Sequence, residues 1–217
     1  MAENKDIYTV LLEGGRGEIE EKKSRFIANI RPVSTEEEAV SFIAEMKKKY
    51  WDARHNCSAF IIGRNNELSR CSDDGEPGGT AGRPMLEVIT GSGIHNICVV
   101  VTRYFGGILL GTGGLVRAYS QAVKEGLSNC VTGNVVTGYE FEITTDYSDI
   151  SKVLFTLEKA GISPADSSYT DNVKLSVKVS EGAYDSLVKS ITEATGARAK
   201  FSEKNLCSFI DKGGSQT

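Results

Sequence analysis

The stretch NICVVVTRYFGGILLGTGGLVRAY, residues 96–119, decides how the first half of this chain folds. Residues 97–102, ICVVVT, begin with five apolar residues and are the segment of the chain most typical of a buried strand. A glycine-rich passage follows, and a helix is predicted from about Thr112 to Ser128. This order of strand, loop and helix brings unpaired backbone N–H groups to the start of the helix, where an anion would be stabilised.

The residues before this stretch alternate between strand and helix patterns. A helix is predicted at about 34–50, because Ala39, Phe42 and Met46 recur on one helical face. A short helix is predicted after Pro84, since proline suits the first helical position. Strands are predicted at residues 7–12, 18–33, 56–62 and 67–71. The mixture predicts an α+β domain.

The second half follows the order βαββαβ, which is typical of a ferredoxin-like fold. Strands are predicted at 138–144, 162–170, 173–179 and 197–206, and helices at 148–160 and 181–194. A linker near Gly133 and Asn134 separates the halves. We therefore expect one domain at residues 1–134, a second at 135–210, and a flexible tail at 211–217.

Composition and charge narrow the classes of function. The chain has 217 residues, of which 40% are hydrophobic, and its net charge of −4 is shared by both halves. A protein that binds DNA strongly would carry a basic domain, so strong DNA binding is not expected. The sequence shows neither a signal peptide nor an apolar run long enough to cross a membrane. Five scattered cysteines without a CxxC pair indicate reduced thiols in a cytoplasmic protein.

Residues 73–82, DDGEPGGTAG, are too rich in glycine for regular structure. Three carboxylates, those of Asp73, Asp74 and Glu76, fall within four positions beside glycines that let a backbone approach a ligand. A cation site, an acid/base pair and a binding loop are all compatible with this pattern, although the calcium-loop spacing is not met. The alternative is a solvated turn whose acids cap neighbouring backbone groups.

Residues 106–117, GGILLGTGGLVR, open the predicted helix. Gly106 and Gly111 have the spacing of a P-loop, but the lysine of that motif is missing, and Val116 breaks a dinucleotide-binding GxGxxG. A looser phosphate-binding helix start and simple close packing of strand against helix both remain open. His55, Cys57 and Cys71 lack a suitably spaced fourth ligand, so packing is favoured over zinc, and no metal site is predicted.

Arginine replaces lysine throughout the middle of the chain. No lysine occurs between Lys49 and Lys124, but six arginines do, namely Arg54, Arg64, Arg70, Arg83, Arg103 and Arg117. The planar guanidinium matches carboxylate and phosphate groups. These side chains could therefore bind an anionic ligand or pair with the acids at 73–76.

Three strings of the first half resemble the Impact/YigZ family. They are ARHNCSAFIIG (53–63), SDDGEPGGTAGRPMLEVI (72–89) and the opening stretch 96–119. The second half resembles the small domain that bacterial YigZ-like members carry. The resemblance implies a first domain of the ribosomal-protein-S5-domain-2-like kind and a ferredoxin-like second domain. This pair is similar to the last two domains of the translocating elongation factor, which implies contact with the ribosome or RNA.

The resemblance does not extend to one feature of the eukaryotic regulator in this family. That protein has an additional N-terminal domain, which binds its partner in a starvation-response kinase pathway. Here the first strand is predicted to begin about seven residues from the start of the sequence, so we expect that domain to be absent. Its partner is therefore not expected to bind this chain. What the family implies is a role in translation regulation and stress response.

Two functions follow as hypotheses. The leading one is a cytoplasmic binding protein that contacts RNA, the ribosome or a translation factor through residues 73–83 and 103–119. The alternative is a small-molecule enzyme, for phosphoryl transfer or hydrolysis, that uses the glycine loop at 106–114. It is disfavoured because no nucleophile or base can be assigned. No cofactor and no membrane contact are predicted, and an anion is expected near Gly111–Gly114. The candidate binding residues are Asp73, Asp74, Gly75, Glu76, Gly78, Thr80, Gly82, Arg83, Arg103, Tyr104, Gly106, Gly107, Gly111, Gly113, Gly114 and Arg117.

Overall fold

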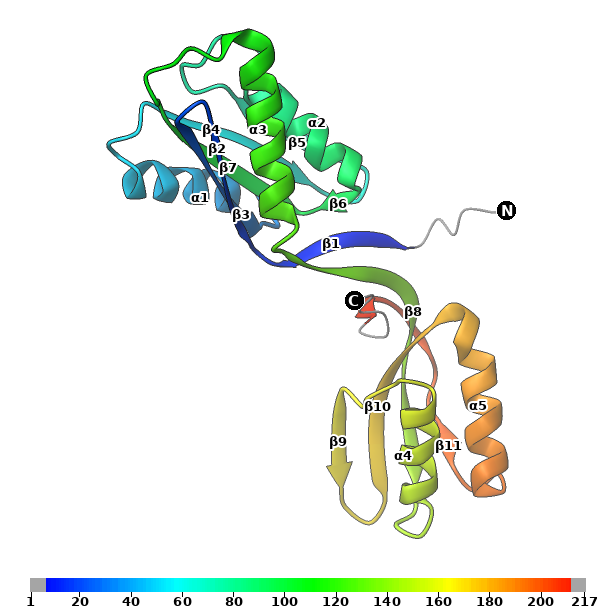
Figure 1. Cartoon of the computed structure of the whole chain (residues 1–217). Coiled ribbons are helices and arrows are strands. Elements are labelled where there is room, and N and C mark those ends of the chain that lie inside the picture. The colour runs from blue at the N-terminus through cyan, green and yellow to red at the C-terminus, as the bar shows by residue number, and fades with distance from the viewer. Residues whose placement is uncertain (1–6, 212–217) are drawn as a thin grey trace. The chain divides into compact units, whose positions relative to one another are not determined.

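The computed structural model describes residues 7–211 (Figure 1). It divides into two compact units, Tyr8–Gly133 and the chain from Asn134 onward, to which Ile7 is also assigned. Both units combine helices with antiparallel sheet, which confirms the α+β class. None of the helices within residues 7–211 is long and apolar enough to cross a membrane.

The first unit is built around a five-stranded antiparallel sheet in the order β2-β3-β7-β4-β5. Its strands are β2 (Arg16–Glu21), β3 (Ser24–Pro32), β4 (His55–Ile62), β5 (Leu68–Ser72) and β7 (Ile97–Tyr104). The strand predicted at 97–102 is the central one, and Val101 lies opposite Ala28 of β3 and Cys57 of β4. Two further strands, β1 (Tyr8–Glu13) and β6 (Ile94–His95), form a short parallel ladder.

Helices cover both faces of this sheet. They are α1 (Glu36–Lys49), α2 (Gly82–Ser92) and α3 (Gly111–Leu127). Val99 and Val101 point into a core with α2 and α3, whereas Cys98 and Val100 point into a second core with α1. Burial on both faces explains why β7 lacks the alternation of a half-exposed strand. Thr35 caps α1 by accepting a hydrogen bond from the Glu38 N–H.

The single strand predicted at 18–33 is wrong, because the structure has a tight hairpin there. Glu21 pairs with Ser24, and the two residues between them are Lys22 and Lys23, with φ of 48° and 67°. Two successive left-handed residues form the turn that matches the twist of antiparallel strands. Lysine is not a usual residue at such positions, so the sequence carries no turn signal.

The second unit has the predicted βαββαβ order. Its elements are β8 (Val131–Thr145), α4 (Ile150–Lys159), β9 (Asp166–Tyr169), β10 (Val173–Ser180), α5 (Glu181–Thr195), β11 (Lys200–Phe201) and β12 (Asn205–Asp211). The sheet runs β9-β10-β8, and both β11 and β12 pair with β8 on its other side. This is the ferredoxin-like arrangement.

The last strand, predicted at 197–206, is instead two strands. The chain leaves the ladder after Phe201, where the Ser202 hydroxyl accepts a hydrogen bond from the Glu142 N–H, and rejoins β8 at Asn205. β12 then continues to Asp211. The flexible tail predicted at 211–217 therefore begins inside a strand, and residues 212–217 lie outside the described residues.

A close backbone contact fixes α3 against β2. A Cβ atom on Gly17 would lie 2.3 Å from the Gly126 backbone nitrogen, and one on Gly126 would lie 2.9 Å from Ile30 Cδ1. We expect Gly17→Ala to lower the free energy of unfolding by about 2–3 kcal/mol, because backbone must move. Gly91→Ala is the matched control: a Cβ there meets nothing within 4 Å, so it should raise stability by about 0.5–1 kcal/mol. Urea denaturation of both variants checks this, and equal effects would contradict it.

Candidate functional site

The loop at 73–82 is closed by the Asp73 carboxylate. It accepts hydrogen bonds from the backbone N–H groups of Gly79 (2.8 Å), Ala81 (3.0 Å) and Gly82 (2.8 Å). Burial opposes ionisation of Asp73, but the three N–H donors outweigh it and hold its pKa below the ordinary value. Gly82 is required here, because a Cβ would lie 2.8 Å from the backbone of Ser72. Asp73 therefore organises the loop and the first turn of α2.

Asp74 connects the same loop to the start of β4 and to α1. Its Oδ2 accepts a hydrogen bond from the Asn56 N–H (2.7 Å), and its Oδ1 pairs with Lys47 (2.5 Å). Its carbonyl accepts a hydrogen bond from His55 Nδ1 (2.9 Å). Asp74 itself has φ of 43°, in the left-handed region.

Glu76 turns inward and forms a buried ion pair with Arg103 at the end of β7. Arg103 Nη1 lies 2.8 and 3.1 Å from the two carboxylate oxygens, and the two side chains are 8% and 2% exposed for Arg103 and Glu76. The Tyr119 hydroxyl of α3 donates to the same carboxylate (2.8 Å). The pair thus joins the loop, the sheet and α3 in one polar cluster beneath the surface.

Two weakly acidic groups complete this cluster. The Cys57 thiol lies 2.9 Å from the Asp73 carbonyl and 3.3 Å from the Tyr119 hydroxyl. Burial raises the pKa of Cys57 to about 12 and also raises the pKa of Tyr119. Both groups are therefore neutral near pH 7, and Cys57 is a hydrogen-bonding core residue, not a nucleophile.

Arg103 lies between two aromatic rings. Its guanidinium carbon is 5.5 Å from the Phe26 ring centre and 5.6 Å from that of Phe105. Its Nε is buried and has no hydrogen-bond partner among the described residues. Phe26 is fully buried, whereas Phe105 is 53% exposed. The cation therefore supports one aromatic side chain that faces solvent.

The passage after β7 is held against the β2–β3 hairpin. The Gly106 N–H donates to the Ser24 hydroxyl (3.1 Å), and a Cβ on Gly106 would lie 2.0 Å from the backbone of Lys23. The Tyr104 hydroxyl donates to Asp52 (2.8 Å). Beyond this anchor, Ile108 is 44% exposed and Leu109 is 83% exposed. The residues that follow Gly106 thus present apolar side chains to solvent.

The start of α3 has no capping side chain. Leu110 is its N-cap, no acidic residue occurs in its first turn, and Gly111 has φ of 72°. Arg117 reaches back over this turn, since its Nη1 lies 3.7 Å from the place a Cβ on Gly113 would take. Arg117 is exposed and has no ion pair or hydrogen bond with any residue in 7–211.

The comparisons with known proteins cover the whole architecture. Residues 22–127 match the Impact N-terminal domain, and residues 143–198 match a domain of unknown function, DUF1949. IMPACT family member YvyE of Bacillus subtilis is 40% identical over 205 residues, 94% of each chain. This chain belongs to the Impact family. IMPACT family member YigZ of Escherichia coli is 41% identical over 134 residues, which are 61% of this chain and 66% of that protein.

A solved structure shares the fold of this Impact family member. It is described as a crystal structure of a hypothetical protein, is 31% identical, and superposes with a TM-score of 0.59. The superposition covers 90% of this chain and 96% of the other. These findings confirm the family and the two-domain fold that the sequence strings predict.

The structure brings the two glycine-rich segments of this family member together through Glu76 and Arg103. Of the arginines that the sequence offers for an anionic ligand or for the acids at 73–76, Arg103 is buried and paired with Glu76, whereas Arg117 is exposed. Arg83 pairs with Glu87 of its own helix, and the Thr80 hydroxyl donates to the Pro77 carbonyl.

The remaining candidate residues are mainly glycines that shape the loops. Gly75 and Gly107 have φ of 86° and 84°, and a Cβ on Gly78 would meet nothing within 4 Å. Gly114 is buried, where a Cβ would lie 3.0 Å from Leu110 Cβ. In the described part of the chain, no group of three or more His, Cys, Asp or Glu side chains could hold a metal ion.

Sequence reasoning missed Tyr119, Asn56 and Lys47, which hold the site together. Tyr119 lies on the apolar face of α3, at the helical spacing expected of a core residue. Its hydroxyl is the one feature in the sequence that indicates a polar partner. Lys47 and Asn56 lie in different elements from their partner Asp74, and no sequence pattern connects them.

The buried pair makes a stability prediction. Arg103→Ala leaves the Glu76 carboxylate buried without a counter-charge, so we expect the free energy of unfolding to fall by about 3–5 kcal/mol. Arg117→Ala removes an exposed side chain and should change it by no more than about 0.5 kcal/mol. Urea denaturation followed by circular dichroism measures both, and similar losses in the two variants would disprove this difference.

Asp73 makes a prediction about pH. Its pKa is lower in the folded protein than in the unfolded chain, so its ionisation stabilises the fold above about pH 4, and this contribution is lost as the pH falls further. Asp73→Asn should lower the free energy of unfolding by about 2 kcal/mol at pH 7, through weaker bonds to the loop N–H groups. The difference in free energy of unfolding between the native protein and Asp73→Asn should become smaller below pH 4 in denaturant titrations from pH 7 to pH 3. A difference that stays constant would exclude ionisation of Asp73 as its cause.

Proposed function

We propose that this Impact family member is a translation-associated cytoplasmic protein that binds RNA through one surface of its first unit. This Phe105 surface comprises Lys22, Lys23, Arg54, Phe105, Ile108, Leu109 and Arg117. The observation that carries the proposal is an exposed aromatic ring packed over the buried Arg103 guanidinium, in a unit that also carries exposed basic side chains without ion pairs.

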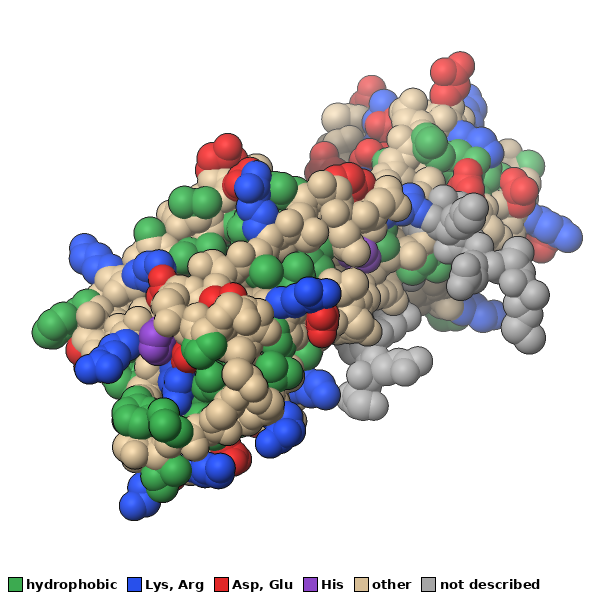
Figure 2. All heavy atoms as spheres, turned by 90° about the horizontal axis from the view of Figure 1, so that it is seen from above, with side chains coloured by type: hydrophobic (Ala, Val, Ile, Leu, Met, Phe, Trp, Pro, Cys, Tyr) green, Lys and Arg blue, Asp and Glu red, His purple; other side chains and the backbone are tan. Residues whose placement is uncertain are grey.

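The apolar part of the Phe105 surface is unusual for a solvent-facing loop. Phe105, Ile108 and Leu109 are consecutive or nearly so, and each exposes between 44% and 83% of its surface. Contiguous exposed apolar side chains with polar neighbours mark interaction sites. Figure 2, which looks down on the end of the first unit where β7 ends and α3 begins, shows such side chains with lysine and arginine side chains around them.

The basic part of the surface is available for phosphate groups. Lys22 and Lys23 form the hairpin turn against which Gly106 packs, and Arg54 directly precedes His55, which lies opposite Arg103. Like Arg117, these three cations make no ion pair within the described structure. Glu20 and Glu21 line the same hollow as Arg117, and Asp52 precedes Arg54 by two residues. The local excess of positive charge is therefore modest, which favours a short RNA segment over a long duplex.

The geometry suggests how RNA would be held. An unpaired base would stack on the Phe105 ring, whose opposite side is supported by the Arg103 guanidinium. The flanking phosphates would meet Lys22, Lys23 and Arg117, and the uncapped first turn of α3 would add backbone N–H donors. Stacking and phosphate contacts of this kind need little sequence specificity, as expected for contact with ribosomal RNA.

Substitution of Phe105 and Arg117 tests this function. Phe105→Ala should weaken binding of a labelled 12-nucleotide single-stranded RNA about 5- to 100-fold, as expected for a lost stacking contact. Arg117→Ala should weaken it less and lower the slope of log K against log salt by about 0.7, because one phosphate contact is lost. Fluorescence anisotropy at several salt concentrations, with sedimentation of each variant with purified ribosomes, gives the result.

The controls lie on α1, which covers the opposite face of the sheet. Val40→Ala and Lys48→Ala each remove one exposed apolar or basic side chain and should leave binding unchanged. If Phe105→Ala and Arg117→Ala behave like these controls, the Phe105 surface does not bind RNA. Ribosome sedimentation that depends on Phe105, without any binding of isolated RNA, would point to a ribosomal protein and would also overturn the RNA proposal.

A further inference from the structure

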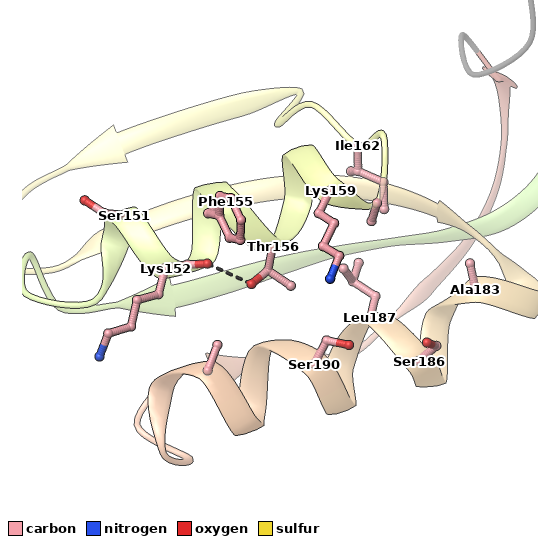
Figure 3. A pocket seen from close by; sticks show the side chains of 12 residues that line it. Ser151, Lys152, Phe155, Thr156, Lys159, Ile162, Ala183, Ser186, Leu187 and Ser190 are labelled. Atoms are coloured by element: carbon pink, nitrogen blue, oxygen red, sulfur yellow. Dashed lines mark hydrogen bonds between the residues drawn. The ribbon is translucent and has the colours of Figure 1, made fainter.

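A groove between two helices of the second unit is independent of the Phe105 surface. It lies between α4 and α5 and encloses about 820 Å³ (Figure 3). Its floor includes Leu187, which is 4% exposed, and its walls carry mainly small side chains. These are Ser151, Thr156, Ala160, Ala183, Ser186, Ser190 and Ala194. Because the side chains on the walls are small, the groove has room for large side chains of a ligand.

The chemistry of the groove is apolar with a positive edge. Phe155 stands on α4 with 66% of its surface exposed, a large apolar side chain that the unit itself does not cover. Lys152 and Lys159 also line the groove from α4, and Figure 3 shows Lys159 reaching toward α5. No acidic residue lines it. Lys152 is paired with Asp149, whereas Lys159 makes no ion pair with any residue in 7–211.

We propose that this groove binds an amphipathic α-helix of another protein, with large apolar side chains on one face and aspartate or glutamate beside them. α4 has 10 residues and α5 has 15, so the groove runs for about 15–22 Å, or three to four turns of a docked helix. A ligand helix with apolar residues at i, i+3, i+4 and i+7 fits such a length. Its acidic flank would meet the Lys159 ammonium group.

Other occupants match the groove less well. RNA would lie against an apolar floor and find only two ammonium groups, with one of them already paired. A second copy of this chain, joined groove to groove, would bring Lys152 and Lys159 of one protomer against the same residues of the other. An acidic helix satisfies both the apolar walls and the positive edge.

The test uses the full chain and two synthetic probes. One is an 18-residue helix-forming peptide with leucine at the i, i+3, i+4 and i+7 positions and glutamate beside them; its twin has lysine in place of every glutamate. Fluorescence anisotropy should show the acidic peptide binding at least tenfold more tightly than its twin. Phe155→Ala should weaken binding of the acidic peptide about tenfold, and Lys159→Glu should abolish the preference over the twin.

A matched variant separates the groove from general charge. Lys189→Glu makes the same change of charge at an exposed position of α5 that does not line the groove, and it should leave peptide binding unchanged. The melting temperature should change little in Phe155→Ala and Lys189→Glu, since both side chains are exposed. Lys159→Glu should lower it slightly, because it places a carboxylate in the last turn of α4, and the variant should still be folded under the binding conditions. Equal binding of the twin peptide, or equal effects of Lys159→Glu and Lys189→Glu, would overturn the proposal. So would displacement of the peptide by single-stranded RNA, or self-association in sedimentation experiments that Phe155→Ala abolishes.

Discussion

The buried ion pair between Glu76 and Arg103 is the constraint on which the arrangement of the 73–82 loop, the end of β7 and α3 depends. A charge pair removed from water is stabilising only if its geometry is good and its remaining hydrogen-bonding groups are satisfied. Here the Tyr119 hydroxyl adds a third contact to the carboxylate, and two aromatic rings flank the guanidinium. The pair and the Tyr119 hydroxyl thus tie the 73–82 loop to β7 and to α3.

Much of the fold could be predicted because it rests on periodicity. Val99 and Val101 face one core and Cys98 and Val100 the other, and this double burial is visible as an unbroken apolar run. The hairpin turn at Lys22 and Lys23 could not be predicted, because its left-handed backbone is imposed by strand pairing and not by residues that prefer it. The break at Ser202 is equally hidden, since it depends on a hydrogen bond to a strand far away in sequence.

The candidate site was predictable in outline but not in its roles. Glycine and acid content marks residues 73–82 as a special loop, and the residues that follow β7 as a second one. Which acids face inward is decided by tertiary contacts: Asp73 binds its own loop, Asp74 reaches α1, and Glu76 is buried against Arg103. The local sequence does not distinguish these three carboxylates. The direction in which each side chain points is determined by the partner that the fold brings close to it.

The strand order has a consequence for synthesis of the protein. β3 and β4 both flank β7 and do not pair with each other, although they are made first. Their inner edges stay without partners until Tyr104 has left the ribosome, so about half of the chain emerges before the central ladder can close. During that interval two apolar strands, one containing Phe26 and the other Phe60, offer exposed edges to other chains. The longer the interval between the emergence of β4 and that of β7, the longer the nascent chain is exposed to aggregation.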